Sequence, residues 1–121
     1  MKTIIQNMTV PQLNWAVACL RGYSSFTFWP NGQVSTRQST GLDAPHNYCT
    51  DWNKSGIIID REGITLMHRP EVHLWWATAG DARLPDTRGS LGRSPLIAAM
   101  RAYVLLFHDH DDEIEIPPEL E

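Results

Sequence analysis

The chain has 121 residues and a formal net charge of −4, with ordinary shares of charged and apolar residues. This length predicts a single domain, residues 1–121, whose core buries about two-thirds of the unfolded surface without disulfides or a metal. The sequence has no run of Lys and Arg and no stretch of ~18 apolar residues, which argues against binding to a nucleic-acid duplex and against a membrane span.

The N-terminal segment and the two cysteines predict the cellular compartment in which the protein acts. Residues 1–10 contain no apolar signal segment. The two cysteines, Cys19 and Cys49, have no CxxC spacing, so we interpret them as buried thiols of a reducing cytoplasm.

The first predicted helix begins after Thr9. Pro11 suits its first turn, Gln12 stands at capping-box spacing from Thr9, and Gly22 ends it after Arg21. Trp15 lies opposite the apolar face, where a helix that covers a single core would not need it.

Several short segments rich in aromatic and β-branched residues predict strands, at 23–29, 33–37, 57–59, 64–67 and 72–77. Pro30-Asn31-Gly32 predicts a hairpin turn between the first two. Residues 38–47 read as a loop. Trp75 and Trp76 are adjacent, so they must face opposite sides of the sheet.

Residues 81–94 predict a long linker, and Ser94 then caps a second helix with Pro95 at its first position. That helix is expected to run to about Phe107, with a core face and few polar residues elsewhere. A polar turn at 108–113 and a short strand at 114–116 follow. We therefore predict an α+β fold in which two helices pack on a small antiparallel β-sheet of about four to six strands, the second helix being central.

Three stretches carry a family resemblance: 13–18 with Gly22, 50–52 with Gly56 and 57–62, and 94–104 with 113–117. In these the sequence resembles the NinX family of small lambdoid-phage accessory proteins. The resemblance implies a phage or prophage origin and action in the bacterial cytoplasm. It implies no enzymatic activity, catalytic residue or cofactor.

Arg101 is the only charged residue between Pro95 and Phe107. A buried guanidinium must be paired, because an unpaired buried charge is very costly. It pairs either structurally, with Asp51, Glu62 or a backbone carbonyl, or with a bound anion such as a phosphate.

A second candidate anion site is the segment Gly89-Ser90-Leu91-Gly92-Arg93-Ser94, which runs into a helix N-terminus. Arg88 and Arg93 add positive charge there. The alternative is an ordinary glycine loop that ends in a Ser cap.

Asp51 and Trp52 form the third candidate. Asp51 either makes an Asx turn or, with Trp52, lines a ligand cleft. Trp15 and Trp76 (or Trp75) offer further stacking faces, since core packing does not need all five Trp. The run His108 to Asp112 has no zinc spacing and is interpreted as a solvated turn, so we expect no metal.

Two functions follow as hypotheses. The first is a non-enzymatic accessory protein that binds a small anionic, nucleotide-like ligand, a signal of host defence being the natural candidate. The alternative is an interaction module that binds and inhibits a host enzyme, suggested by the acidic residues 109–121 and exposed apolar side chains. A small nucleotide hydrolase or lyase is a third reading, which no catalytic pattern supports. We also expect homo-oligomers, because the second helix has few charges and Trp15 faces outward.

Overall fold

The computed structural model describes residues 1–79 and 88–121. In chain order its elements are β1 (Lys2–Thr3), η1 (Ile5–Asn7), α1 (Val10–Leu20), β2 (Thr27–Phe28), β3 (Val34–Arg37), β4 (Asp43–Pro45), α2 (Trp52–Glu62), β5 (Thr65–Arg69), η2 (Pro70–Val72), β6 (Leu74–Ala79), β7 (Arg88–Gly92), α3 (Pro95–Val104), β8 (Ile114–Glu115) and η3 (Pro118–Leu120).

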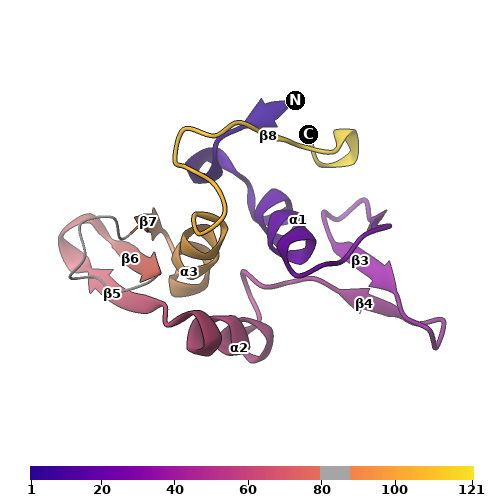
Figure 1. The fold of residues 1–121 in the computed structure, drawn as a ribbon, viewed down its shortest axis with the longest axis horizontal. Helices are drawn as coiled ribbons and strands as arrows, with labels where there is room; N and C mark the ends of the chain where they lie inside the picture. The colour runs from indigo at the N-terminus through magenta and orange to yellow at the C-terminus, as the bar shows by residue number, and fades with distance from the viewer. Residues whose placement is uncertain (80–87) are drawn as a thin grey trace.

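The α+β class is confirmed, but the predicted arrangement of two helices on one sheet is wrong. Over the described residues there are three α-helices and three small antiparallel sheets. The sheets have the strand orders β1-β8, β2-β3-β4 and β5-β6-β7. In Figure 1 the two larger sheets lie on opposite sides of the helical pair α1 and α3.

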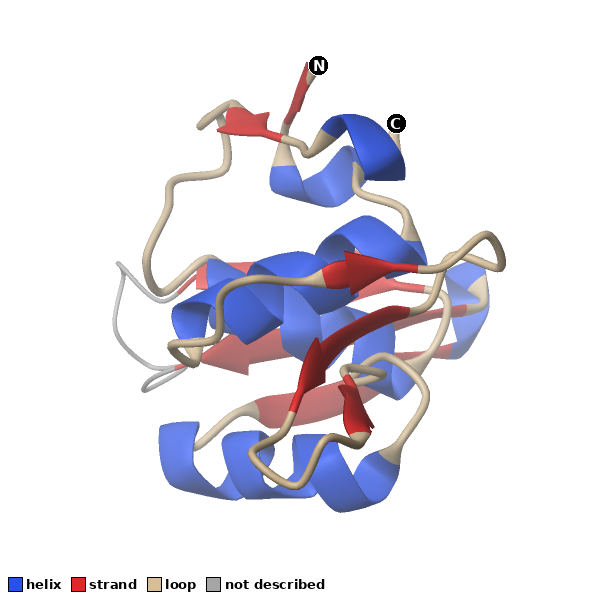
Figure 2. Cartoon of the chain, turned by 90° about the vertical axis from the view of Figure 1, so that its right-hand side faces the viewer, coloured by secondary structure: helices blue, strands red, loops and turns tan. Residues whose placement is uncertain are grey.

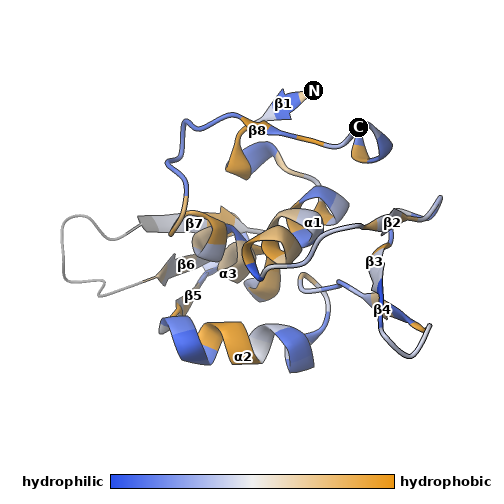
Figure 3. Ribbon diagram, turned by 45° about the vertical axis from the view of Figure 1, so that its right-hand side comes forward, coloured by the Kyte–Doolittle hydropathy of each residue, from blue (hydrophilic) through white to orange (hydrophobic). Residues whose placement is uncertain are grey.

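Helix α3 is central, as predicted. It contacts β5, β6 and β7 on one side and α1 and α2 on others, and Figure 3 shows hydrophobic residues on α3 and on α1. Ser94 caps it, with Pro95 in the first turn, and Leu96 to Met100 are all buried. The helix ends at Val104 rather than at about Phe107, and Phe107 is 54% exposed.

Helix α1 begins and ends where the sequence places it. The Gln12 amide donates to Thr9 Oγ1 (3.3 Å) and the Thr9 amide donates to Gln12 Oε1 (3.0 Å), which completes the capping box. Gly22 follows with φ +93°. Of the two predicted buried thiols, Cys49 is buried, whereas Cys19 near the end of α1 is exposed.

Helix α2 replaces the predicted buried strand at residues 57–59. Asp51 caps its first turn and Gly63, in the left-handed conformation with φ +61°, ends it. Of the three isoleucines, Ile58 is buried and Ile57 is exposed. The run was misread because three adjacent apolar residues have no clear period, whereas the two caps with eleven residues between them mark a helix.

Two strands stand where loops were predicted. β4 lies within residues 38–47 and pairs with β3, so that Pro45 opposite Ser35 occupies an edge strand, where its missing amide is tolerated. β7 occupies the second half of the predicted linker and pairs with β6. The predicted linker residues 81–87 lie outside the described residues.

The predicted hairpin is present but shorter. The Gly32 amide donates to the Trp29 carbonyl (2.9 Å), and β2 pairs with β3 through Phe28 opposite Val34. The strand predicted at 23–29 is reduced to Thr27–Phe28.

The two ends of the chain lie together at one end of the molecule (Figure 2). β1 pairs with β8, and the Ile116 amide donates to the Met1 carbonyl (2.8 Å). The buried Gln12 side chain donates to the Leu120 carbonyl (2.9 Å), which fixes η3 against α1. Across residues 1–79 and 88–121, no helix is long and apolar enough to cross a membrane.

Candidate functional site

A cavity of about 350 Å³ opens between the end of α1, the β3-β4 pair and the first turns of α2. We call it the His46 cleft. Its lining combines aromatic rings, planar amides and charged groups, from Arg21, Tyr23, Gln38, Ala44, Pro45, His46, Tyr48, Asp51, Asn53, Lys54 and Ile57.

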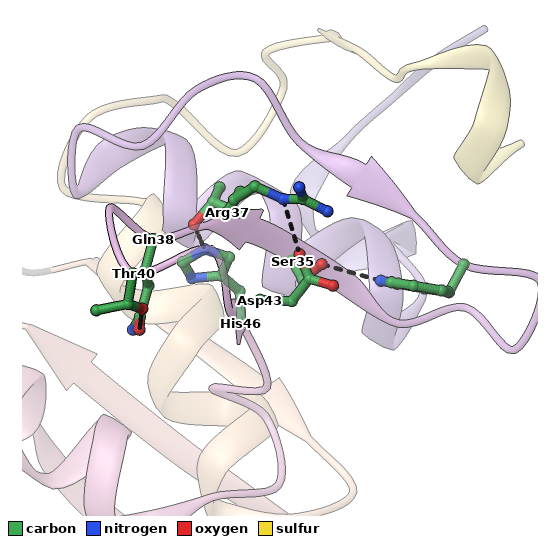
Figure 4. A network of polar contacts seen from close by, with 8 residues as sticks. Ser35, Arg37, Gln38, Thr40, Asp43 and His46 are labelled. Atoms are coloured by element: carbon green, nitrogen blue, oxygen red, sulfur yellow. Dashed lines mark hydrogen bonds and ion pairs between the residues drawn. The ribbon is translucent and has the colours of Figure 1, made fainter.

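His46 forms the fixed back of this cleft. The imidazole is only 4% exposed, and its Nε2 lies 2.9 Å from Thr36 Oγ1 on β3 while its Nδ1 lies 3.0 Å from the Tyr48 hydroxyl. Figure 4 shows the ring held to the sheet near Gln38, which lines the same cleft. Both ring nitrogens are therefore engaged within the protein.

Burial sets the charge of this network. It lowers the pKa of His46, and Lys54 and Arg21 lower it further through charge repulsion. Burial also raises the pKa of Tyr48 to about 12. At neutral pH the imidazole is thus uncharged and the phenol keeps its proton, so the network is a neutral hydrogen-bonded wall.

Residues 46–51 are pinned between two helices. The buried Asn14 side chain on α1 accepts a hydrogen bond from the Cys49 amide (3.0 Å). On the other side, the Ser55 hydroxyl of α2 donates to the Tyr48 carbonyl. Asp51 then accepts from the Asn53 amide (2.9 Å) and starts α2. The polar groups of the cleft are consequently placed by buried contacts rather than by a free loop.

Two cations border the cleft. The Arg21 guanidinium carbon lies 5.8 Å from the centroid of the Tyr48 ring, a cation–π distance. The Lys54 ammonium donates to the Pro45 carbonyl, and burial lowers its pKa while the Asp51 carboxylate opposes that shift. These two cations face one carboxylate, Asp51, in a protein whose net charge is −4.

An aromatic surface completes the arrangement. Tyr23 is 44% exposed, and its ring centroid lies 4.5 Å from that of His46. An exposed ring beside amide groups and cations can bind a flat, polar, negatively charged molecule.

Asp51 is the one predicted site residue that lines the His46 cleft. Its side chain makes the Asx-type contact with the Asn53 amide, and it lines the cavity as well. Trp52 follows it as the first residue of α2 but is 54% exposed and does not line the cavity.

Arg93 and Arg101 line a different cavity of about 280 Å³ between η1, α1 and the start of α3. Arg101 Nη1 donates to the Leu91 carbonyl (2.8 Å) and Nη2 lies 3.4 Å from the Met8 carbonyl, while Nε is buried without a hydrogen-bond partner. The predicted carbonyl partner is therefore present. In the described part of the chain, neither Asp51 nor Glu62 forms an ion pair with Arg101.

The remaining predicted site residues lie elsewhere in the fold. The Ser94 hydroxyl accepts from the Ile97 amide (3.2 Å) as the cap of α3. Trp15 is half-buried and lines a small cavity of about 110 Å³ with Cys19. Trp76 on β6 lies directly over Gly89 of β7. The structure thus separates Trp15, Trp76 and the arginines from Asp51.

The His-Asp run forms a turn in which Asp112 Oδ2 accepts from the Asp109 amide (2.9 Å) and lies 3.7 Å from His108 Nδ1. Within residues 1–79 and 88–121, no three His, Cys, Asp or Glu side chains are grouped to hold a metal ion.

Most of the His46 cleft was missed from the sequence. Arg21, Tyr23, His46 and Tyr48 come from segments that tertiary contacts bring together, and none belongs to a recognisable motif. One local signal was available, because His46 and Tyr48 are only two residues apart in the sequence.

Comparison with known proteins gives one family. Residues 5–106 match the family described as Bacteriophage P22, NinX. No curated protein matches the chain.

Proposed function

The chain belongs to the NinX family of bacteriophage proteins, and we propose that this phage accessory protein binds a small anionic, nucleotide-like ligand in the His46 cleft. One observation carries the proposal: a single cavity brings together an exposed Tyr ring, planar amides and two cations. Its volume of about 350 Å³ also lies within the range of small-molecule sites.

Each part of such a ligand has a matching group. The Tyr23 ring offers a stacking face, which contributes ~1–3 kcal/mol per base in nucleic-acid complexes. Gln38 and Asn53 offer donors and acceptors for the edge of a heterocycle. Arg21 and Lys54 offer charge-assisted hydrogen bonds to an anion.

The proposed activity is binding without turnover. His46 is the natural candidate for a general base, but Thr36 and Tyr48 occupy both of its ring nitrogens. A phage protein that holds a nucleotide-like signal of host defence in this way would act as a sponge that lowers its free concentration.

Calorimetric titration with purine and pyrimidine ribonucleotides tests the proposal. We expect Lys54→Gln and Tyr23→Leu to weaken the tightest ligand at least roughly tenfold, about 1.4 kcal/mol. Arg69→Gln is the matched control, because Arg69 lies on β5, outside the cleft, and pairs with Glu71 of η2. Equal affinities in all four proteins would contradict the proposal, as would mass spectra showing that the ligand is converted.

The alternative, an interaction module that occupies a host enzyme, has its own supporting observation. A groove of about 450 Å³ on the β2-β3-β4 side is lined by Trp29, Pro30, Asn31, Gln33, Ser35, Asp43 and Pro45. Trp29 is 43% exposed, and its indole N–H donates to Ser35 Oγ (2.9 Å), so the ring is held in place and remains partly exposed. Capture of a stoichiometric host protein that Trp29→Ala abolishes would favour this function.

A further inference from the structure

A second cavity shares Arg21 with the His46 cleft. It has a volume of about 230 Å³ and is lined by Leu20, Arg21, Ile58, Arg61, Glu62 and Tyr103. We call it the Arg61 cavity. Because Arg21 lines both the His46 cleft and the Arg61 cavity, it lies at the boundary between them.

The Arg61 cavity is polar and carries two arginines against one carboxylate. The charges of Glu62, Arg21 and Arg61 all act on the Tyr103 hydroxyl, whose pKa is raised chiefly by burial, so these groups gather around one point. Over the described part of the chain, neither Arg21 nor Arg61 lies within 4.0 Å of a carboxylate oxygen as an ion pair. Both guanidinium groups therefore keep donors for an external anion.

The three cations are distributed over the two cavities: Lys54 lines the His46 cleft, Arg61 lines the Arg61 cavity, and Arg21 lines both. Lys54 and Arg61 are seven residues apart on α2, which puts them on one helix face about 10 Å apart along the axis. Lys54 is fixed to the Pro45 carbonyl, and Arg21 stands between the two cavities. Because Lys54 lines only the His46 cleft and Arg61 lines only the Arg61 cavity, a ligand that forms charge-assisted bonds to both must extend past Arg21.

We propose that the ligand carries a phosphate chain, as a nucleoside di- or triphosphate does. Its base, sugar and first phosphate occupy the His46 cleft, where Lys54 contacts that phosphate, and the rest of the chain passes Arg21 into the Arg61 cavity. This inference rests on the proposed function and adds the chemical class of the ligand. Glu62 limits the affinity, because it leaves the Arg61 cavity with a net charge of only one.

The test compares a nucleoside with its mono-, di- and triphosphate by calorimetry at fixed salt. In the unaltered protein we expect the triphosphate to bind roughly tenfold or more tightly than the monophosphate, the gain of one charge-assisted contact. Arg61→Gln should remove that difference without weakening the monophosphate. Glu62→Gln, which removes the opposing charge, should increase it, and Arg69→Gln should leave every affinity unchanged.

Two results would overturn the inference in different ways. Equal affinities for mono- and triphosphate, or equal weakening of both by Arg61→Gln, would overturn the phosphate-chain assignment and leave nucleotide binding intact. If the unsubstituted protein is folded and binds neither the nucleoside nor any of its phosphates, the proposed function and this inference are both overturned.

Discussion

Arg101 shows how far a single residue can be interpreted from sequence. A lone guanidinium in an apolar helix was expected to be paired, and Arg101 donates a hydrogen bond to the Leu91 carbonyl. A backbone carbonyl was among the predicted partners, but the particular carbonyls of Leu91 and Met8 were not predictable, because they come from segments that approach α3 only in the folded chain. Asp51, one of the two acids considered as a partner from the sequence, instead caps α2 and lines the His46 cleft.

Replacement of Arg101 by Ala should lower the free energy of unfolding by about 1–3 kcal/mol, the cost of leaving a buried polar group unsatisfied. This loss of stability is smaller than the loss expected if a buried carboxylate were left without its partner. The Leu91 carbonyl also keeps a hydrogen bond from Gln6 Nε2 (3.3 Å) after the substitution. Urea titration measures it. Arg93→Gln, at an exposed arginine of the same cavity, is the control and should change stability by less than about 0.5 kcal/mol. Unaltered stability of Arg101→Ala would contradict this account.

At the scale of elements, caps were more informative than apolar runs. α1 and α3 were predicted within a few residues because Thr9, Gly22 and Ser94 mark their ends. The strands β4 and β7 were missed because their composition is that of a loop and pairing with a neighbour defines them. In β7 the glycines serve close packing: a Cβ on Gly89 would lie 2.1 Å from the Trp76 ring.

Gly92 is the position where β7 meets α3 most closely. A Cβ there would lie 2.5 Å from the Ala98 amide nitrogen and 2.9 Å from its Cα, backbone atoms that cannot turn away. Gly92→Ala should therefore cost roughly 1–3 kcal/mol or more in urea unfolding. Gly56→Ala is the control, since Gly56 lies within α2 with no atom within 4 Å of an added Cβ, and it should stabilise by up to ~1 kcal/mol. Equal effects of the two substitutions would refute the close-packing argument.

At the scale of the whole molecule, the two features that suggested an oligomer, the low charge of α3 and the apolar Trp15, are both explained by contacts within one chain. The low charge of α3 is explained by its contacts with α1, α2 and the β5-β6-β7 sheet, and Trp15 packs partly against the core. Self-association stays a prediction, for which the exposed Met67 on the edge strand β5 offers an apolar contact. Light scattering at micromolar concentration should give more than 13.7 kDa, reduced by Met67→Lys. A clean monomer would exclude it.

The stability of the whole molecule should depend on pH through His46. Burial, Lys54 and Arg21 lower the pKa of this ring below its usual value of 6.5. The folded chain therefore binds the proton less readily than the unfolded chain, so stability rises with pH in this window. The contribution is fully present above about pH 6.5 and is lost as the pH falls through the lower, folded-state pKa.

Thermal melts between about pH 7.5 and pH 5.5 should show this loss in the unaltered protein and a smaller loss in His46→Gln, which cannot take up the proton. His110→Gln, at an exposed turn position, should melt like the unaltered protein across the same range. Magnetic resonance titration of the ring gives the same answer without substitution, because a folded-state pKa below 6.5 is required. A pKa at or above that value would contradict the buried, neutral imidazole on which the geometry of the His46 cleft depends.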